Sequence, residues 1–357
     1  MKIKYWDESE TADIKIVSEI RHIRLGHFRN CAIYGIDSHY PHPLVKSGGE
    51  LLLPTIEKFM SLGRGTVYEP DMEWDQEQVT INNREDNPVF YFVYNMANYF
   101  HWIYDTVPYL YSYFLEKKRI KNLKLLVSPP AGEEDLYPFV YETLELLGIN
   151  RDDLIFLDYN TRYSTILIGS SLTHNRMSLD PPHRGMFQVL ESIKGTPSDK
   201  EKIYISRRTS TQDESNNIGT DYTKQRMCVN EDEVVELFKD YGFEEVFCES
   251  LSMKEKIGLF QSAKFVAGPI GGGLSNVIFC SPKTRVLSIN SPEFFSINKR
   301  LEFALRHTDL HHFDDTSFVE RKEEYIPNKN SLSVSGGMNS PWQVNINSLK
   351  NKLEEIL

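Results

Sequence analysis

Cysteine is scarce in this sequence of 357 residues. Its four copies, Cys31, Cys228, Cys248 and Cys280, show neither the paired spacing of a zinc site nor the density of a disulfide scaffold. Three of them lie in apolar surroundings, where a free thiol packs as a small hydrophobic group. We therefore expect free thiols in a protein of a reducing compartment.

Long apolar runs are also lacking. No uninterrupted run reaches the length of about 18 residues that spans a bilayer. The opening stretch MKIKYWDESETADIK has no apolar core of the kind that a secretory signal needs. Both observations favour a cytoplasmic protein.

An excess of positive charge is absent as well. The formal net charge is −11 at pH 7, whereas binding to nucleic acid without sequence preference draws on a basic surface that neutralises phosphates. We therefore expect no nucleic-acid partner, although a local basic pocket is compatible with this charge. The content of 40% apolar and 12% aromatic residues is typical of a globular protein, and the length suggests two domains.

Strand patterns and helical patterns alternate from residue 88 onward. The expected strands are 88–94, 123–128, 154–158, 164–170, 202–208, 244–249, 264–269 and 284–290. The expected helices are 98–118, 133–148, 230–242, 252–263, 272–280 and 346–357, two of them beginning with capping boxes formed by Asn230 with Glu233 and by Ser252 with Glu255. Such alternation predicts an α/β fold with mostly parallel sheets covered by helices.

The prolines of HNRMSLDPPHRG, residues 174–185, interrupt this alternation. We place a domain boundary there, which gives a first Rossmann-like domain at 1–180, a second at 181–330, and a terminal loop and helix at 331–357. Two such halves in tandem predict a cleft between them. Residues 1–90 are harder to interpret, with short strands around CAIYGID and GTVYEP.

Three consecutive glycines, Gly271, Gly272 and Gly273, follow the strand that contains Gly268, at the point where the next expected helix begins. In an open parallel sheet, ligands collect at the carboxyl ends of the strands, where amides at a helix N-terminus attract an anion. Glycines there let a phosphate approach the backbone. The alternative is a tight turn that needs glycine only for its dihedral angles. The spacing GPIGGGLSN is not the dinucleotide fingerprint GxGxxG.

The strand KIYI ends in adjacent arginines, Arg207 and Arg208. Planar guanidinium groups bind phosphate oxygens through two hydrogen bonds, and this strand is expected to end on the same edge as the glycine turn. The alternative is a solvated pair in a loop.

His101 and Asp105 are four residues apart in NMANYFHWIYDTVPYL and therefore share one face of the expected helix. Either side chain could act as a general base, and Asp105 could instead orient the imidazole. The alternative is a buried histidine whose hydrogen bond is satisfied by Asp105, among aromatic core residues.

Two further polar stretches suggest metal binding by composition only. RHTDLHHFDD, residues 306–315, fits no common zinc spacing and is expected to be a polar loop. The acidic groups at 70–75 and 230–233 are better explained as solvated charge and as helix capping. We expect no metal and no cofactor.

Together, these stretches resemble glycosyltransferase family 61, which includes many bacterial capsular-polysaccharide proteins. The resemblance runs in order through NYFHWIYDTVPYLY, YISRR, Arg226, NEDEVVELFKDYGFEEV and GPIGGGLSNVIFCSPKTRVLSI. Ile270, Gly272 and Ser288 depart from residues that many members carry, His, Ala and an acidic residue respectively. Residues 1–90 and 300–357 match nothing in the family pattern.

The resemblance implies a GT-B type fold, with the nucleotide-sugar bound mainly by the second domain and the acceptor mainly by the first. It also implies an inverting transfer, without an obligatory metal, from a nucleotide-sugar (UDP-linked by the family's general habit) to a hydroxyl of a growing surface glycan. Because such glycans are often lipid-linked, association with the inner face of the membrane is expected. The implied site residues are as follows: His101 or Asp105 as base, Arg207, Arg208, Gly268, Gly271, Gly272, Gly273 and Asn276 for the donor, and Asn98, Arg226, Asn230 and Glu231 at motif positions without an assigned role.

Two other functions compete with this interpretation. One is an oxidoreductase or epimerase that holds a dinucleotide on the glycine turn, against which the missing fingerprint weighs. The other is a non-catalytic partner with the same fold, which the departures at Ile270 and Ser288 suggest. The oligomeric state is not predicted.

Overall fold

The chain divides into two compact units in a computed structural model. Unit 1 comprises Met1–Ala97 and His101–Leu190, and unit 2 comprises Asn98–Phe100 and Glu191–Leu357. The structure describes residues 3–4, 15–16, 24–34, 44–47, 50–52, 81–93, 96–130, 133–169, 184–208, 226–293, 309–320 and 340–357. The expected boundary at 180/181, the expected loop at 331–339 and the acidic group at 70–75 lie outside the described residues.

Unit 1 is built on a mixed sheet with the strand order β1-β5-β4-β3-β10-β7-β8-β9, to which β2 adds on β3 and β6 on β10. These strands are β1 (Ile3–Lys4), β2 (Lys15–Ile16), β3 (Arg24–Tyr34), β4 (Leu44–Ser47), β5 (Glu50–Leu52), β6 (Asn83–Glu85), β7 (Val89–Tyr91), β8 (Lys124–Val127), β9 (Leu154–Phe156) and β10 (Thr161–Gly169). The path β10-β7-β8-β9 is parallel, as the alternation predicted.

The strands before residue 53, for which no pairing was predicted, add antiparallel pairs to the sheet of unit 1. β3 pairs antiparallel with β10, and β4 pairs antiparallel with β3 and β5. The short connections between β3, β4 and β5 allow antiparallel pairing, whereas a parallel pair needs a crossover of a dozen or more residues. The antiparallel pair of β3 and β10 joins segments far apart in the chain and does not follow from this spacing.

The segment expected to form one helix over 98–118 changes its winding three times. It begins as α2 (Tyr99–His101), widens into a π-helix at Trp102–Thr106, tightens into a 3₁₀ turn at Val107–Tyr109 and continues as α3 (Leu110–Lys117). Pro108 explains the change, because proline has no N–H and its ring clashes with the carbonyl four residues earlier. The N–H of Val107 bonds the carbonyl of Trp102, five residues back.

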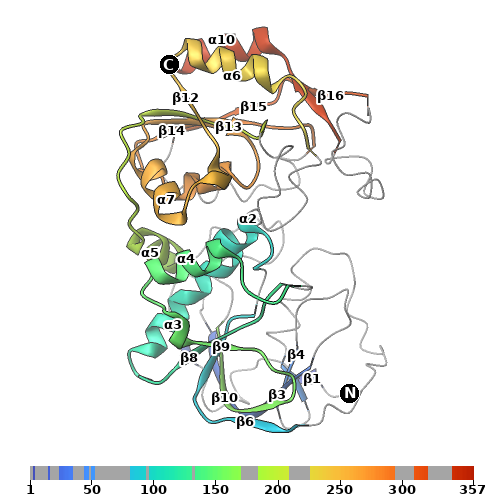
Figure 1. Cartoon of the computed structure of the whole chain (residues 1–357), viewed down its shortest axis with the longest axis vertical. Helices are drawn as coiled ribbons and strands as arrows, with labels where there is room; N and C mark the ends of the chain where they lie inside the picture. The colour runs from blue at the N-terminus through green and yellow to red at the C-terminus, as the bar shows by residue number, and fades with distance from the viewer. Residues whose placement is uncertain are drawn as a thin grey trace. The chain divides into compact units, whose positions relative to one another are not determined.

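Two further helices are α4 (Pro138–Leu146) in unit 1 and α5 (Arg184–Ser192), which runs from unit 1 into unit 2 (Figure 1). Phe92 meets Trp102 with ring centres 5.8 Å apart, and Nε1 of Trp102 donates to Oγ1 of Thr143 at 3.1 Å. The intervening residues, such as Tyr91, join a second cluster with Tyr163 on the opposite face. This packing fixes the helix that carries His101 and Asp105.

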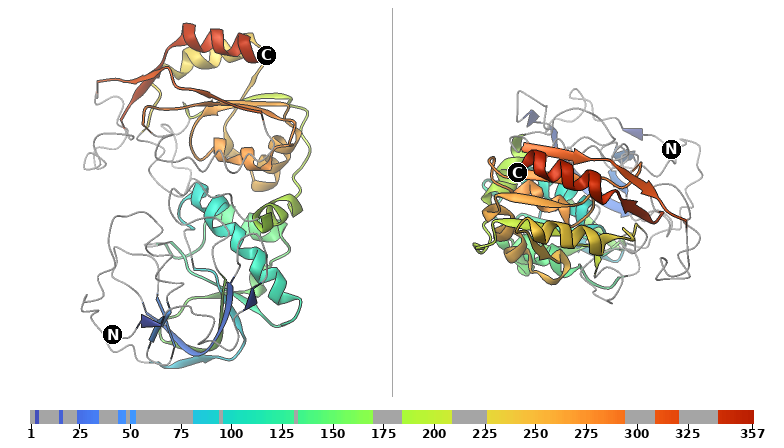
Figure 2. Two further views of the ribbon diagram at one scale, coloured as in Figure 1. Left: turned by 180° about the vertical axis from the view of Figure 1, so that it is seen from behind. Right: turned by 90° about the horizontal axis from the view of Figure 1, so that it is seen from above.

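Unit 2 is built on a parallel sheet with the order β12-β11-β13-β14-β15. Its elements are β11 (Lys202–Ile205), α6 (Glu231–Asp240), β12 (Glu244–Val246), α7 (Met253–Ser262), β13 (Phe265–Pro269), β14 (Arg285–Ile289), β15 (Asp309–Phe313) and α10 (Ile346–Ile356), with a separate pair of β16 (Thr316–Phe318) and β17 (Trp342–Val344). α6 and α10 cover one face of the sheet and α7 covers the other (Figures 1 and 2). The predicted second alternation is confirmed.

Two local expectations in unit 2 are wrong. His311 and His312 belong to strand β15 and not to a polar loop. Asn230 stands at the N-terminus of α6 without a side-chain capping bond. Its amide bonds the backbone of Val344 in both directions instead, at 2.9 and 3.0 Å. The capping box of Ser252 and Glu255 on α7 is confirmed.

No helix in the described part of the chain has the length and the apolar character that a membrane crossing requires.

Candidate functional site

The carboxyl ends of the five parallel strands of unit 2 bring polar residues to one edge of the sheet. Arg207 follows β11, Glu249 follows β12, Gly271 follows β13, Asn290 follows β14 and Asp314 follows β15. In open α/β sheets this is the edge where ligands bind.

Packing explains why two of the glycines after β13 carry no side chain. A Cβ on Gly268 would stand 2.8 Å from the carbonyl oxygen of Ile205, and one on Gly273 would stand 2.8 Å from Cγ2 of Ile205. Neither glycine has a positive φ; among the described residues, only Gly148 and Gly242 combine glycine with that backbone region. The close approach of β11, and not the dihedral angle, therefore requires these two glycines.

Gly271 and Gly272 face different surroundings. A Cβ on Gly272 would meet nothing within 4 Å, and one on Gly271 would stand 3.4 Å from Nη1 of Arg207. The bend after β13 is thus open at Gly272 and is lined by the Arg207 guanidinium at Gly271. The structure brings these two parts of the sequence prediction together.

The helix expected after the glycines is a short 3₁₀ helix, Leu274–Phe279. The prediction of an α-helix is wrong here, because Ser275 and Asn276 use their polar side chains within the turn. Ser275 Oγ donates to the carbonyl of Gly272 at 2.5 Å, and Asn276 Nδ2 donates to that of Gly273 at 2.8 Å. Such local bonds compete with regular helix.

Arg207 is held by Glu231 at the start of α6. The backbone N–H of Arg207 donates to Oε1 of Glu231 at 2.8 Å, and the same oxygen accepts from the hydroxyl of Tyr204 at 3.2 Å. Burial lowers the pKa of the Arg207 guanidinium, while the charge of Glu231 opposes the shift. Burial likewise raises the pKa of Glu231, whereas the hydrogen bond from the backbone of Arg207 lowers it.

Arg226 adds a second cation beside Arg207. Its side chain is buried, and burial together with the positive charge of Arg207 lowers its pKa to about 9. Two guanidinium groups that repel each other in a low-dielectric environment form an arrangement that a bound anion would stabilise.

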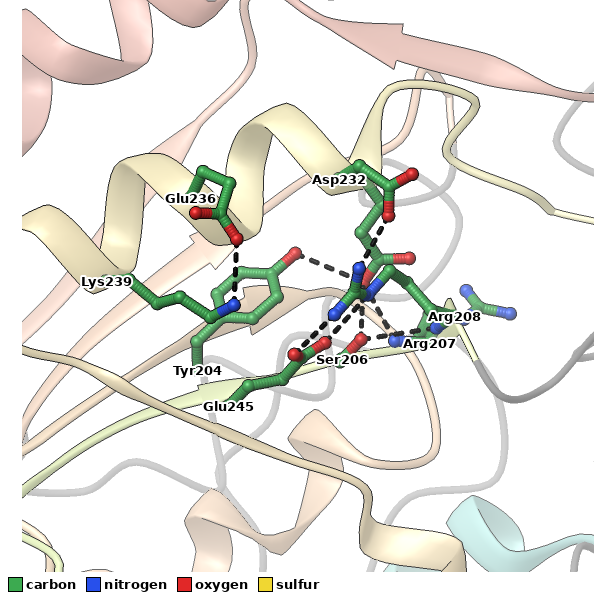
Figure 3. Close-up of polar contacts among 9 residues, drawn as sticks. Tyr204, Ser206, Arg207, Arg208, Asp232, Glu236, Lys239 and Glu245 are labelled. Atoms are coloured by element: carbon green, nitrogen blue, oxygen red, sulfur yellow. Dashed lines mark hydrogen bonds and ion pairs between the residues drawn. The ribbon is translucent and has the colours of Figure 1, made fainter.

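Arg208 points elsewhere. Its Nε and Nη2 bond the carboxylate of Glu245 at 2.8 and 2.5 Å, and its Nη1 bonds Asp232 at 2.6 Å. Figure 3 shows the Arg208 guanidinium between these two carboxylates, whereas the guanidinium of Arg207 lies apart from them. The structure therefore places only Arg207 of the pair at the glycine bend.

Two residues near this edge, Glu249 and Lys256, were missed in the sequence. Glu249 has an oxygen, Oε1, that is buried without a hydrogen-bond partner, and burial raises its pKa against the charges of Lys256 and Arg207. Lys256 is buried on α7, with Nζ 5.0 Å from the ring centre of Tyr99. No sequence motif marks these positions, because they meet only through the sheet topology.

Tyr99 reaches the glycine bend from a distant part of the sequence. The segment Asn98–Phe100 belongs to unit 2, and the Tyr99 hydroxyl donates to Oδ1 of the buried Asn276 at 2.5 Å. With its amide also bonded to Gly273, Asn276 holds the segment and the bend together. Asn98, for which a role was left open, lies in the same segment.

His101 and Asp105 form a pair within unit 1, as their spacing predicted. Nδ1 of His101 lies 2.6 Å from Oδ2 of Asp105, and the side chains are 30% and 19% exposed. When Nδ1 carries the proton and donates it to Asp105, Nε2 holds the lone pair that can accept a proton. The described residues contain no group of three His, Cys, Asp or Glu side chains suited to a metal ion.

The fold and the site define an α/β protein of the Rossmann-like class, with an arginine beside a glycine bend at the ligand-binding edge of a parallel sheet. The family model of Glycosyltransferase 61 matches residues 99–287, just over half of the chain, and the protein therefore belongs to this family. The resemblance seen in the sequence is thus confirmed. Family membership indicates a glycosyltransferase, which takes a sugar donor and a glycan acceptor. A search of curated proteins found no match.

Proposed function

We propose that this glycosyltransferase uses a nucleotide-sugar donor, UDP-linked, and transfers a hexose or pentose with inversion to a hydroxyl of a growing capsule- or lipopolysaccharide-type glycan. The observation that carries the proposal is the Arg207 guanidinium beside Gly271 at the carboxyl edge of the parallel sheet. A diphosphate at this bend would meet Arg207 and would relieve its repulsion with Arg226.

In the proposed reaction, the acceptor hydroxyl oxygen attacks the anomeric carbon while the bond from that carbon to the diphosphate oxygen breaks. Nε2 of His101 takes the hydroxyl proton, and Asp105 holds Nδ1–H and stabilises the imidazolium that forms. The diphosphate leaves with the bonding electrons. A single displacement of this kind inverts the anomeric configuration.

Positive side chains supply the charge that the leaving group requires. We assign this role to Arg207 and Arg226, with Gly271 and Gly272 leaving room for phosphate oxygens. Preorganised cations in a partly dehydrated site stabilise developing negative charge strongly. The proposal therefore needs no metal ion, and it places the enzyme in the cytoplasm, at the inner membrane face where lipid-linked glycans are built.

The test combines binding and turnover. Calorimetry with UDP, GDP and CMP should detect a nucleotide that binds, and a panel of the corresponding nucleotide-sugars should identify one donor that is consumed. If no nucleoside phosphate binds to the full chain, the proposal is wrong.

Variants separate the two candidate bases. With His101 as base, His101→Gln should lower kcat by about 10²- to 10⁴-fold and remove the acidic limb of the kcat–pH profile. Asp105→Asn should retain that limb with a lower plateau. The opposite pattern would assign the base to Asp105. If both variants turn over as fast as the wild type, neither residue is the base.

A further inference from the structure

The carboxyl ends of β14 and β15 carry a second polar cluster at the same edge of unit 2. Asn290 is buried at its centre and accepts a bond from Ser288 Oγ at 2.9 Å. Its Nδ2 donates to Oδ1 of Asp314 at 2.6 Å and lies 3.4 Å from Nδ1 of His312. The amide of Asn290 thus fixes a carboxylate and an imidazole at the end of β15.

Asp314 retains capacity for a ligand. It is exposed, and a carboxylate offers about four lone-pair sites, of which the bond from Asn290 uses one. In dinucleotide-binding sheets an acidic residue after a strand accepts bonds from ribose hydroxyls. A carboxylate held in one orientation by a buried amide is suited to the same chemistry.

Ser291 provides an independent observation. The residue is 3% exposed, and its buried Oγ has no hydrogen-bond partner. Buried polar groups are almost always hydrogen-bonded, because an unmade bond is costly. A ligand at this end of the sheet would supply the missing partner.

The position relative to the glycine bend matches a nucleotide. β14 pairs with β13, and β15 pairs with β14. Because strands lie about 4.8 Å apart, the cluster stands one to two strand spacings from the strand that leads into the bend. Arg207 is on the other side of β13, next to β11. A diphosphate at the bend would therefore have a cation on one side and the Asp314 cluster on the other.

We infer that the nucleoside part of the donor binds at the carboxyl ends of β14 and β15, with the ribose hydroxyls donating to Asp314 and with Ser291 Oγ bonding the ribose or the base. The inference rests on the proposed function. Asn290 is a positioning residue, since its bonds to Ser288 and Asp314 occupy its amide.

The first test uses the ribose hydroxyls themselves. Binding of UDP, 2′-deoxy-UDP, 3′-deoxy-UDP and inorganic pyrophosphate is measured by calorimetry on the full chain and on Asp314→Asn, whose Oδ1 can still accept the bond from Asn290. The wild type should bind at least one deoxy analogue about tenfold more weakly than UDP. Asp314→Asn should weaken the binding of UDP by a similar factor and should bind UDP and that deoxy analogue equally well. Its binding of pyrophosphate should be unchanged.

Asp315→Asn is the matched control, because Asp315 is exposed and adjacent to Asp314. This variant removes the same charge without the proposed contact and should still prefer UDP over the deoxy analogue. Equal weakening of UDP and the deoxy analogues by Asp314→Asn, or no weakening, would overturn the inference. The inference would also be overturned if Asp314→Asn weakened the binding of UDP-glucose but not that of UDP, because Asp314 would then contact the sugar.

Ser291→Ala gives a readout that a structural role would not produce. Removing an unpartnered hydroxyl should leave the melting temperature unchanged or raise it, yet weaken UDP about two- to tenfold. Ser112→Ala in unit 1 is the control, since Ser112 Oγ is also buried without a partner, and it should leave UDP binding unchanged. A Ser291→Ala protein that binds UDP like the wild type contradicts the inference. If no nucleotide binds the wild type, the proposed function itself fails.

Discussion

The adjacent arginines of unit 2, Arg207 and Arg208, have different surroundings. Arg207 lies beside Gly271, whereas Arg208 is bound by Glu245 and Asp232. Successive residues at the end of a strand point in different directions, so only one of the two arginines lines the bend, and the sequence alone does not show which. The structure gives each of them a separate test.

We expect Arg207→Lys to weaken binding of pyrophosphate about tenfold, because a point charge replaces the two-pronged donor. Arg208→Ala should leave pyrophosphate binding within about twofold and lower the free energy of unfolding by about 1 kcal/mol, since it removes a partly exposed ion-pair network. Calorimetry and urea unfolding measure the two effects. If Arg208→Ala weakened pyrophosphate binding and Arg207→Lys did not, Arg208 and not Arg207 would be the arginine that binds the diphosphate.

Residue roles could be predicted from sequence only where the partner is near in the chain. The pair of His101 and Asp105 and the capping box of Ser252 follow from spacings of three or four residues. The partner of Asn230 is Val344, and the partner of Tyr99 is Asn276, more than a hundred residues away in each case. No local pattern encodes such contacts.

At the level of elements, helix α7 and the segment after α5 are joined by a contact between backbones. A Cβ on Gly195 would overlap the backbone of Gly258, and one on Gly258 would overlap that of Thr196. The N–H of Thr196 bonds the carbonyl of Lys254, and Gln261 bonds Gly195 and Ile193. This segment enters unit 2 and fixes the helix that carries Lys256.

Gly258→Ala should therefore destabilise unit 2, although alanine normally stabilises the interior of a helix by about 1 kcal/mol relative to glycine. We expect a loss of about 3 kcal/mol or more, because the overlap is with backbone and cannot be relieved by a rotamer change. Urea unfolding measures the loss. Lys254→Ala, at an exposed position on the same helix, should change stability by less than about 0.5 kcal/mol. A Gly258→Ala protein as stable as the wild type would contradict the close packing.

The order of helices and strands in unit 2 was predictable because short apolar runs such as β11 and β13 alternate with the amphipathic helices α6 and α7. The same rule failed where proline or side-chain bonds to the backbone compete with α-helix, as at Pro108 and at Ser275. The partners of the antiparallel strands of unit 1 were not predicted, since polarity alternation does not specify the partner of a strand.

For the whole molecule, two carboxyl groups with opposite pKa shifts predict opposite responses of the two units to pH. In unit 1, bonds from Thr161, the backbone of Asn160 and Asn83 lower the pKa of Asp158. Its ionised form is thus favoured by folding, and this stability is lost as the pH falls through the folded-state pKa. In unit 2, burial raises the pKa of Glu249 against the bond from its own backbone and the nearby cations. Its contribution is favourable at low pH and is lost as the pH rises through the folded-state pKa.

Asp158→Asn should therefore destabilise unit 1 at pH 7, with the difference from the wild type vanishing as the pH falls. Glu249→Gln should stabilise unit 2, with a gain that is largest at pH 8 and shrinks towards pH 4. Amide hydrogen exchange, corrected for intrinsic rates, measures each unit separately. Glu233→Gln, at an exposed position on α6, is the control for loss of one charge. If Glu249→Gln instead loses stability relative to the wild type as the pH rises, the neighbouring cations stabilise the carboxylate of Glu249 more than burial disfavours it, and the expected direction of its pKa shift is wrong.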